Sequence, residues 1–222
     1  MLSAIRGGIS LFEFFFLIGA YAVIIFIVLP IHELAHAWAA HLLGDDTARW
    51  QGRLKFNPLR HLDLFGTIML VLFGVGYAKP VPVNPYNFRN RKRDMALTAL
   101  AGPLSNIVLA VIAVAIFRVC VFFVTDTALL SYLYLILIDV FASVNIGLAV
   151  FNLLPIPPLD GSRIFGFFLP DRWVDVMEQY SRQISMVVML LLFVGVLDVP
   201  LAFLRGLLGG LIGTLFGMPG LF

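Results

Sequence analysis

Long apolar runs dominate this chain and limit what it can fold into. Mostly apolar stretches cover about residues 9–43, 95–124, 129–154 and 184–197, and a helix needs roughly 20 such residues to cross a bilayer. Hydrophobic residues make up 61% of the 222 residues and charged residues 13%, whereas soluble proteins hold about 45–50% and about 25%. We therefore expect an all-α multi-pass membrane protein with about four to six apolar segments.

Prolines and glycines mark where the apolar pattern is interrupted. The first run is too long for one simple span, and Pro30, which removes a backbone hydrogen bond, is its expected break. Residues 64–77 form a run of about 14 residues, which as a helix would be about 21 Å long and could not cross the roughly 30 Å core. The sequence KPVPVNP at 79–85 follows and cannot be helical. We expect a small re-entrant or extended β-hairpin region near residues 50–84.

The positive charges favour one orientation in the membrane. Twelve of the fifteen Lys and Arg residues lie in residues 49–60, 79–93 and 163–182. Positively charged segments next to spans stay in the cytoplasm, so we expect the stretches 49–60 and 79–93 there and Asp126, between two spans, outside. The net charge is only +2, so the expected partner is the lipid bilayer and not nucleic acid.

Residues 32–36, HELAH, match the metal-binding pattern H-E-x-x-H. On a helix, His32 and His36 differ by about 40° around the axis and about 6 Å along it, so both imidazoles can reach one tetrahedral zinc. Glu33 lies beside them and can take a proton from water that zinc has made acidic. Such a motif also arises by chance. Ionisable side chains inside an apolar run are costly, however, and are therefore functional candidates.

A catalytic zinc usually has three protein ligands and one open position. The pattern that uses a third histidine has Leu42 at that place, and His41 is one residue too early to face the same way. The downstream Glu178 lies in a polar segment. Asp160 is the better candidate, because it lies in a proline-broken stretch at the end of an apolar span, where irregular backbone is tolerated if it lines a polar cavity.

Two asparagines in the apolar runs are further candidates. Asn152 lies in the last turn before the proline-rich break, where its amide could donate to the oxyanion formed during peptide hydrolysis. A hydrogen bond between helices explains it equally well. For Asn106, which follows Gly102 and Pro103, we favour a structural role, because small residues permit close helix packing.

The order and spacing of these motifs resemble the site-2 protease family of intramembrane zinc metalloproteases, peptidase family M50. The resemblance covers most of residues 25–170 and rests on HELAH at 32–36, YAKPVPVN at 77–84, GPLSN at 102–106, NLLP at 152–155 and LDG at 159–161. It implies His32, His36 and Asp160 as ligands of one Zn²⁺ per chain, Glu33 as general base and Asn152 near the scissile carbonyl. The implied substrate is a membrane-spanning segment of another protein.

These observations together predict a zinc metalloendopeptidase in the cell membrane, with its active site opening to the cytoplasm. We expect a single domain over residues 1–222, with the motif core at about 25–170 and C-terminal apolar segments at 181–222. Compared with larger family members it would be a minimal form without a PDZ or CBS domain. The alternatives are a metal-binding permease and an inactive protease-like scaffold, and neither explains Glu33, which is not needed to hold metal.

Overall fold

The computed structural model describes residues 11–73 and 76–222, and within these residues the chain is helical and contains no strand. Four helices of the described chain are long and apolar enough to cross a membrane: Ile18–Leu42, Arg91–Phe123, Thr127–Asn152 and Asp198–Leu215. The prediction of an all-α multi-pass membrane protein is therefore confirmed.

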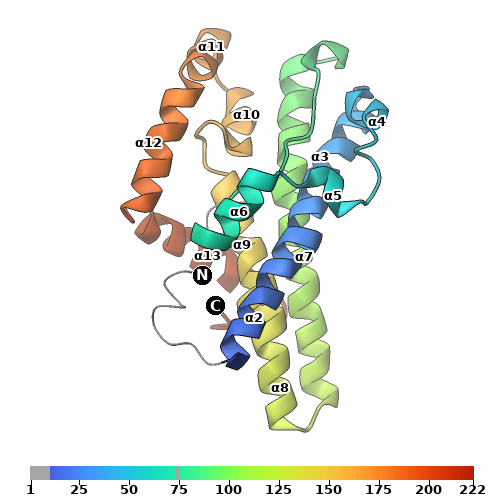
Figure 1. Ribbon diagram of the computed structural model, residues 1–222, viewed down its shortest axis with the longest axis vertical. Coiled ribbons are helices and arrows are strands. Elements are labelled where there is room, and N and C mark those ends of the chain that lie inside the picture. Colours follow the sequence, from blue (N-terminus) through green and yellow to red (C-terminus); the bar gives the residue numbers. More distant parts are fainter. Residues whose placement is uncertain (1–10, 74–75) are drawn as a thin grey trace.

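The elements follow one another with short connections (Figure 1). They are α2 (Leu11–Val23), the π-helical η1 (Ile24–Val28), α3 (Leu29–Leu42), α4 (Thr47–Trp50), α5 (Pro58–His61), α6 (Leu64–Phe73), the 3₁₀ turn η2 (Pro85–Asn87), α7 (Arg91–Phe123), α8 (Thr127–Tyr134), the π-helical η3 (Leu135–Ala142), α9 (Ser143–Asn152), α10 (Asp160–Gly166), α11 (Asp171–Gln179), α12 (Ser181–Phe193) and α13 (Asp198–Leu215).

The first span is one continuous helix made of α2, η1 and α3. Pro30 lies in the first turn of α3, directly after the π-helical residues Ile24–Val28. Proline has no N–H to donate to the carbonyl four residues earlier, and that carbonyl lies in the π-helical segment. The break expected at Pro30 is thus a local irregularity, and the helix that carries residues 32–36 continues to Leu42.

The long helix α7 is the centre of the molecule. It begins where Asn90 and Asp94 cap each other: Asn90 accepts from the N–H of Arg93, and Asp94 accepts from the N–H of Asn90. Further along, α7 contributes small and apolar side chains to a core that also contains residues of η3, α9 and α13. The alanines in this core allow the helices to approach closely. The members of α7 are Ala110, Ala113, Val114 and Phe117, and those opposite are Ile138, Ala142, Ile146, Val150, Leu201 and Ile212.

The segment between α3 and α7 turns back on itself. Leu62, before α6, and Ala78, after it, form an isolated antiparallel bridge, and the N–H of Lys79 donates to the carbonyl of His61 at 2.8 Å. The chain therefore leaves α6 beside the place where it entered. The β-hairpin expected near residues 50–84 is not seen as paired strands: the described part of this region consists of α4, α5, α6 and extended chain.

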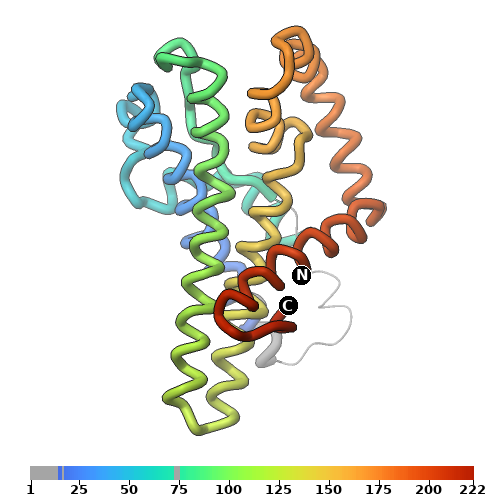
Figure 2. Tube along the Cα trace, turned by 180° about the vertical axis from the view of Figure 1, so that it is seen from behind, coloured from blue at the N-terminus to red at the C-terminus, as the bar shows by residue number. Residues whose placement is uncertain are grey.

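The C-terminal part differs from the expected arrangement. The apolar run at about 184–197 does not form the fourth span-length helix, because α12 ends at Phe193 and the chain turns at Gly195, where φ is +80°. The span-length helix is α13, formed by the glycine-rich end of the sequence. Figure 2 shows α13 crossing α9, against which it packs.

Candidate metal centre

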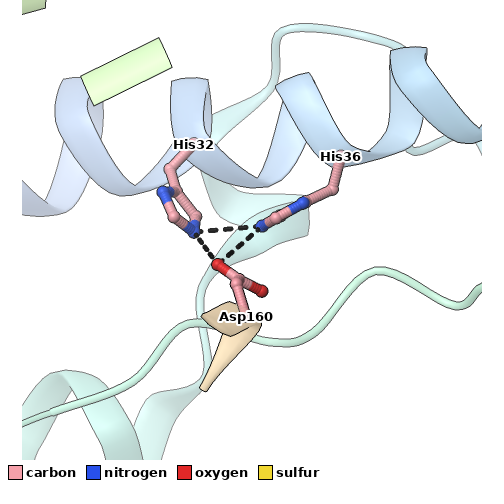
Figure 3. A group of neighbouring side chains, drawn as sticks. All are labelled: His32, His36 and Asp160. Atoms are coloured by element: carbon pink, nitrogen blue, oxygen red, sulfur yellow. Dashed lines mark hydrogen bonds and ion pairs between the residues drawn. The ribbon is translucent and has the colours of Figure 1, made fainter. Parts of the chain in front are cut away.

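Three side chains from two distant parts of the chain meet between α3 and the start of α10 (Figure 3). His32 and His36 lie one turn apart on α3, and Asp160 is the first residue of α10. Asp160 Oδ2 lies 3.3 Å from Nε2 of His32 and 3.3 Å from Nε2 of His36. The two Nε2 atoms are 3.1 Å apart. The structure thus brings together the three residues that the sequence nominates as metal ligands.

The donor atoms fit zinc. Ligand atoms about 2.0–2.1 Å from one tetrahedral zinc lie about 3.3 Å from each other, close to the three distances observed here. Nδ1 of His36 donates to the carbonyl of Thr98 at 2.8 Å, which leaves its Nε2 as a bare acceptor. Oδ2 of Asp160 is buried and accepts no hydrogen bond from the described residues. Lone pairs of these atoms therefore point toward one another with no hydrogen between them, and a bound cation would stabilise that arrangement.

The charge of Asp160 also fits a ligand. Burial by itself favours the neutral acid, but the adjacent imidazoles of His32 and His36 outweigh it and hold the pKa of Asp160 well below its usual range. A carboxylate binds metal in its ionised form. Asp160 is therefore ready to bind a cation at neutral pH.

Gly102 on α7 packs directly against both imidazoles, a contact that the sequence did not reveal. A Cβ at this position would lie 2.6 Å from Cε1 of His32 and closer still to His36. Together with the carbonyl of Thr98, one turn earlier, it makes α7 the back wall of the site. The available signal was the glycine itself, since glycine inside a helix usually has a packing reason.

Gly161 has a similar steric role next to Asp160. A Cβ there would collide with the carbonyl groups of Leu153 and Leu154, at the end of α9. The sequence suggests an irregular stretch around Asp160, but helix α10 begins at that residue. Close contact between the end of α9 and the first turn of α10 therefore sets the position of the carboxylate.

Glu33, the expected general base, lies beneath an extended segment of residues 79–84, which we call the strap. The N–H of Val81 hydrogen-bonds to its carboxylate. Arg53, whose side chain is buried, approaches the carbonyls of Lys79 and Pro80 at 3.5 Å each. Burial lowers the pKa of Arg53, and the nearby Glu33 carboxylate opposes this shift. The strap thus lies between a buried cation and the glutamate next to the metal group.

The two candidate asparagines have different surroundings. Asn152 is the last residue of α9 and half-buried, and its side-chain amide has no hydrogen bond within residues 11–73 and 76–222. Asn106 on α7 is fully buried, and neither atom of its amide has a hydrogen-bond partner in the described part of the chain. The roles suggested for both residues remain predictions.

Comparison with known proteins identifies the family. Residues 20–132 and 120–196 match the family model described as peptidase family M50. The chain belongs to peptidase family M50. This M50 peptidase is 41% identical to YwhC of Bacillus subtilis over 179 residues, which cover 78% of the present chain and 80% of YwhC.

Two further relatives are more distant. MJ0611 of Methanocaldococcus jannaschii is 31% identical over 134 residues, or 60% of this chain and 62% of MJ0611. Rip2 of Mycolicibacterium smegmatis is 30% identical over 143 residues, or 60% of this chain and 51% of Rip2, so the chain spans about half of that relative. All three relatives are named as zinc metalloproteases. No solved structure matches the chain.

A peptidase family, four apolar helices in the described chain and a His-His-Asp group with buried histidines together characterise the M50 peptidase as an intramembrane zinc metalloprotease. The predictions of the family, the enzyme class and the zinc cofactor are confirmed.

Proposed function

We propose that His32, His36 and Asp160 hold the zinc of this enzyme, and that it hydrolyses peptide bonds in transmembrane segments of membrane proteins. The observation that carries the proposal is the convergence of two Nε2 atoms and one carboxylate oxygen within 3.1–3.3 Å of each other. The absence of a hydrogen-bond partner for Asp160 Oδ2 among the described residues supports it.

Residues of the chain then carry out different steps of the hydrolysis. Zinc, when bound, supplies a Lewis acid that acidifies water and polarises a carbonyl. Glu33 removes the proton from the attacking water and passes it to the leaving amine. The amide of Asn152 donates to the carbonyl oxygen of the substrate as that oxygen gains negative charge. The contact between Thr98 and His36 keeps the imidazole in the tautomer whose Nε2 is free to bind metal.

The strap is the proposed binding surface for the substrate backbone. A transmembrane helix uses its own carbonyls and N–H groups in internal hydrogen bonds, so the segment to be cut must first unwind. Pro80 and Pro82 keep the strap extended, and the described structure gives its residues 80–83 no backbone–backbone hydrogen bonds. Pro80 and Pro82 have no N–H and that of Val81 contacts Glu33, so an extended peptide can pair with the backbone carbonyls of this segment and with the N–H of Val83. Because Val81 lies against Glu33, a peptide paired there would pass the general base.

We further propose that the site opens to the cytoplasm and that α6 is re-entrant. In Figure 1, α4, the start of α7 and α11 lie at one end of the molecule, and the α7–α8 connection lies at the other. The first end carries the three basic stretches of the sequence, which by the positive-inside rule face the cytoplasm. The ten residues of α6 span only about 15 Å. The bridge between Leu62 and Ala78 is consistent with a segment that enters and returns on the same side.

The test separates the base from the ligands. Purified Glu33→Gln should not cleave a single-span peptide but should keep about one zinc per chain, because glutamine preserves shape and cannot accept the proton. Asp160→Ala should lose zinc as well as activity, whereas Asp175→Ala, on the surface of α11, should lose neither. Full activity of Glu33→Gln would overturn the mechanism, and unchanged zinc affinity of Asp160→Ala would overturn the ligand assignment. Zinc flux into vesicles without peptide cleavage would instead indicate a permease.

A further inference from the structure

Asp45 is a completely buried carboxylate outside the metal centre. It follows the helix α3 and has 0% of its surface exposed. Its Oδ1 accepts from the N–H of Thr47 at 3.1 Å, from the hydroxyl of Thr47 at 2.5 Å and from the side-chain amide of Asn87 at 2.7 Å. Its Oδ2 accepts from the backbone N–H of Asn84 at 2.7 Å. Burying a charge is costly unless donors surround it, and here four donors do.

These donors come from two different parts of the chain. Thr47 begins α4 two residues later, so its two bonds make a local turn before that helix. The donors of Asn84, at the far end of the strap, and of Asn87, just beyond it, come from 39 and 42 residues away. A local turn does not need these two long-range bonds. They connect the end of α3, the helix that carries the metal-binding histidines, to the strap.

The strap is held at its other end as well. The N–H of Lys79 donates to the carbonyl of His61, and between the two fixed ends the N–H of Val81 reaches Glu33. Removing the tie at Asp45 would leave this end of the strap with only the 3.3 Å contact between the side-chain amide of Asn87 and the hydroxyl of Thr47. Burial alone would raise the pKa of Asp45, but its hydrogen bonds with Thr47, Asn87 and Asn84 outweigh burial and lower it. The carboxylate that makes the tie is therefore charged at neutral pH.

We propose that Asp45 is a positioning residue for the substrate. It fixes the strap relative to α3, so that an extended substrate segment paired with the strap presents its peptide bond at the level of Glu33. This inference rests on the proposed role of the strap in substrate binding. It assigns Asp45 no contact with substrate or metal.

Asp46 provides a matched control in the next position. It is also an aspartate, but its partners are His41 and Arg49 and not the strap. We expect Asp45→Ala to raise KM for a single-span peptide at least 10-fold and to lower kcat/KM about 100-fold, since a misplacement of about 1 Å can cost that much. Asp46→Ala should stay within about twofold of the wild type. Zinc content, and inhibition by a small hydroxamate that contacts only the metal, should be unchanged in both variants.

A charge swap keeps the test decisive if Asp45→Ala does not fold. Asn87→Asp alone would place two carboxylates at a distance that now holds a hydrogen bond, and should impair cleavage. Adding Asp45→Asn returns a single charge to the same buried place, with the new amide N–H facing it and the amide oxygen still facing the N–H of Asn84. The bond from the N–H of Thr47 is lost, so the double variant should restore part of the lost kcat/KM. A structural defect of each substitution alone would add up in the double variant, so failure of the swap to recover activity would overturn the inference.

Hydrogen exchange tests the positioning role of Asp45 without a cleavage assay. In the zinc-loaded protein, Asp45→Ala should speed exchange at the amides of Val81 and Asn84 at least 10-fold, and Asp46→Ala should not. Unchanged exchange, an equal effect of Asp46→Ala, or a parallel loss of zinc and inhibitor binding in Asp45→Ala would each refute the positioning role. If the wild-type enzyme does not cleave membrane peptides, the proposed function is refuted. The exchange rates would still show whether Asp45 fixes the strap.

Discussion

Replacing Gly102 by alanine tests the close contact between α7 and the metal centre. In an ordinary helix interior this change stabilises a protein by about 1 kcal/mol. Here the added Cβ would lie 2.6 Å from Cε1 of His32 and closer to His36, whereas non-bonded carbon atoms settle at about 3.5 Å. The imidazoles or the backbone of α7 must therefore move by about 1 Å. The substitution should damage the site for steric reasons although it favours the helix.

The expected size follows from how precisely a metal site must be held. Functional geometry tolerates displacements of about 0.5 Å, and loss of the groups that orient metal ligands costs about 10–100-fold in affinity or activity. We expect Gly102→Ala to bind zinc at least roughly 10-fold more weakly, which corresponds to about 1.4 kcal/mol. Competition with a chromophoric zinc chelator measures this directly, and cleavage of a single-span peptide should fall in parallel.

Gly206→Ala on α13 is the matched control, because nothing lies within 4 Å of the Cβ it would add. Its zinc affinity should equal that of the wild type, and its thermal stability should be unchanged or slightly higher. Zinc affinity of Gly102→Ala within twofold of the wild type would refute the reasoning, because a Cβ would then fit where the structure leaves no room.

Three other predictions concern the reaction and the topology. Asn152→Ala should lower kcat about 100-fold with little change in KM if its amide stabilises the oxyanion; a loss of thermal stability alone would favour a packing role. Removing zinc with a chelator should abolish cleavage, and zinc but not magnesium should restore it, because magnesium prefers oxygen ligands; recovery with magnesium would contradict the site. Single cysteines replacing Lys55, Arg91 or Asp126 in a Cys120→Ala background should react with an impermeant thiol reagent on intact cells at position 126 only, and external labelling at just one of positions 55 and 91 would exclude a re-entrant α6.

Hydropathy was a good guide to the long helices and a poor one near the C-terminus. A helix in lipid must satisfy its backbone internally, so long apolar runs such as Arg91–Phe123 formed the expected spans. The apolar run at 184–197 forms only the shorter helix α12, because the chain turns at Gly195. Glycine weakens helices in water, yet the glycine-rich stretch of α13 forms a span-length helix.

The candidate site was likewise predictable only in part from the sequence. The spacing of His32 and His36 is a local property of one helix, and Asp160 could be chosen because few ionisable residues compete with it in the apolar chain. The contributions of Gly102 and Asp45 depend on segments far away in sequence, since each acts on a partner in another element. Periodicity tells which side of a helix is apolar but not which neighbour that side will meet. These residues could therefore be recognised only in the folded chain.

The separation of the three proposed zinc ligands along the chain has a consequence for biosynthesis. His32 and His36 enter the membrane with the first span, but Asp160 follows only after two more spans, α7 and the helix of α8 to α9, have been made. At roughly 5–20 residues per second, the ribosome needs on the order of ten seconds to reach it. During that time the nascent chain has only two of the three residues that we propose as zinc ligands. On that proposal, the protease is inert beside other newly inserted membrane proteins until most of its own chain has been integrated.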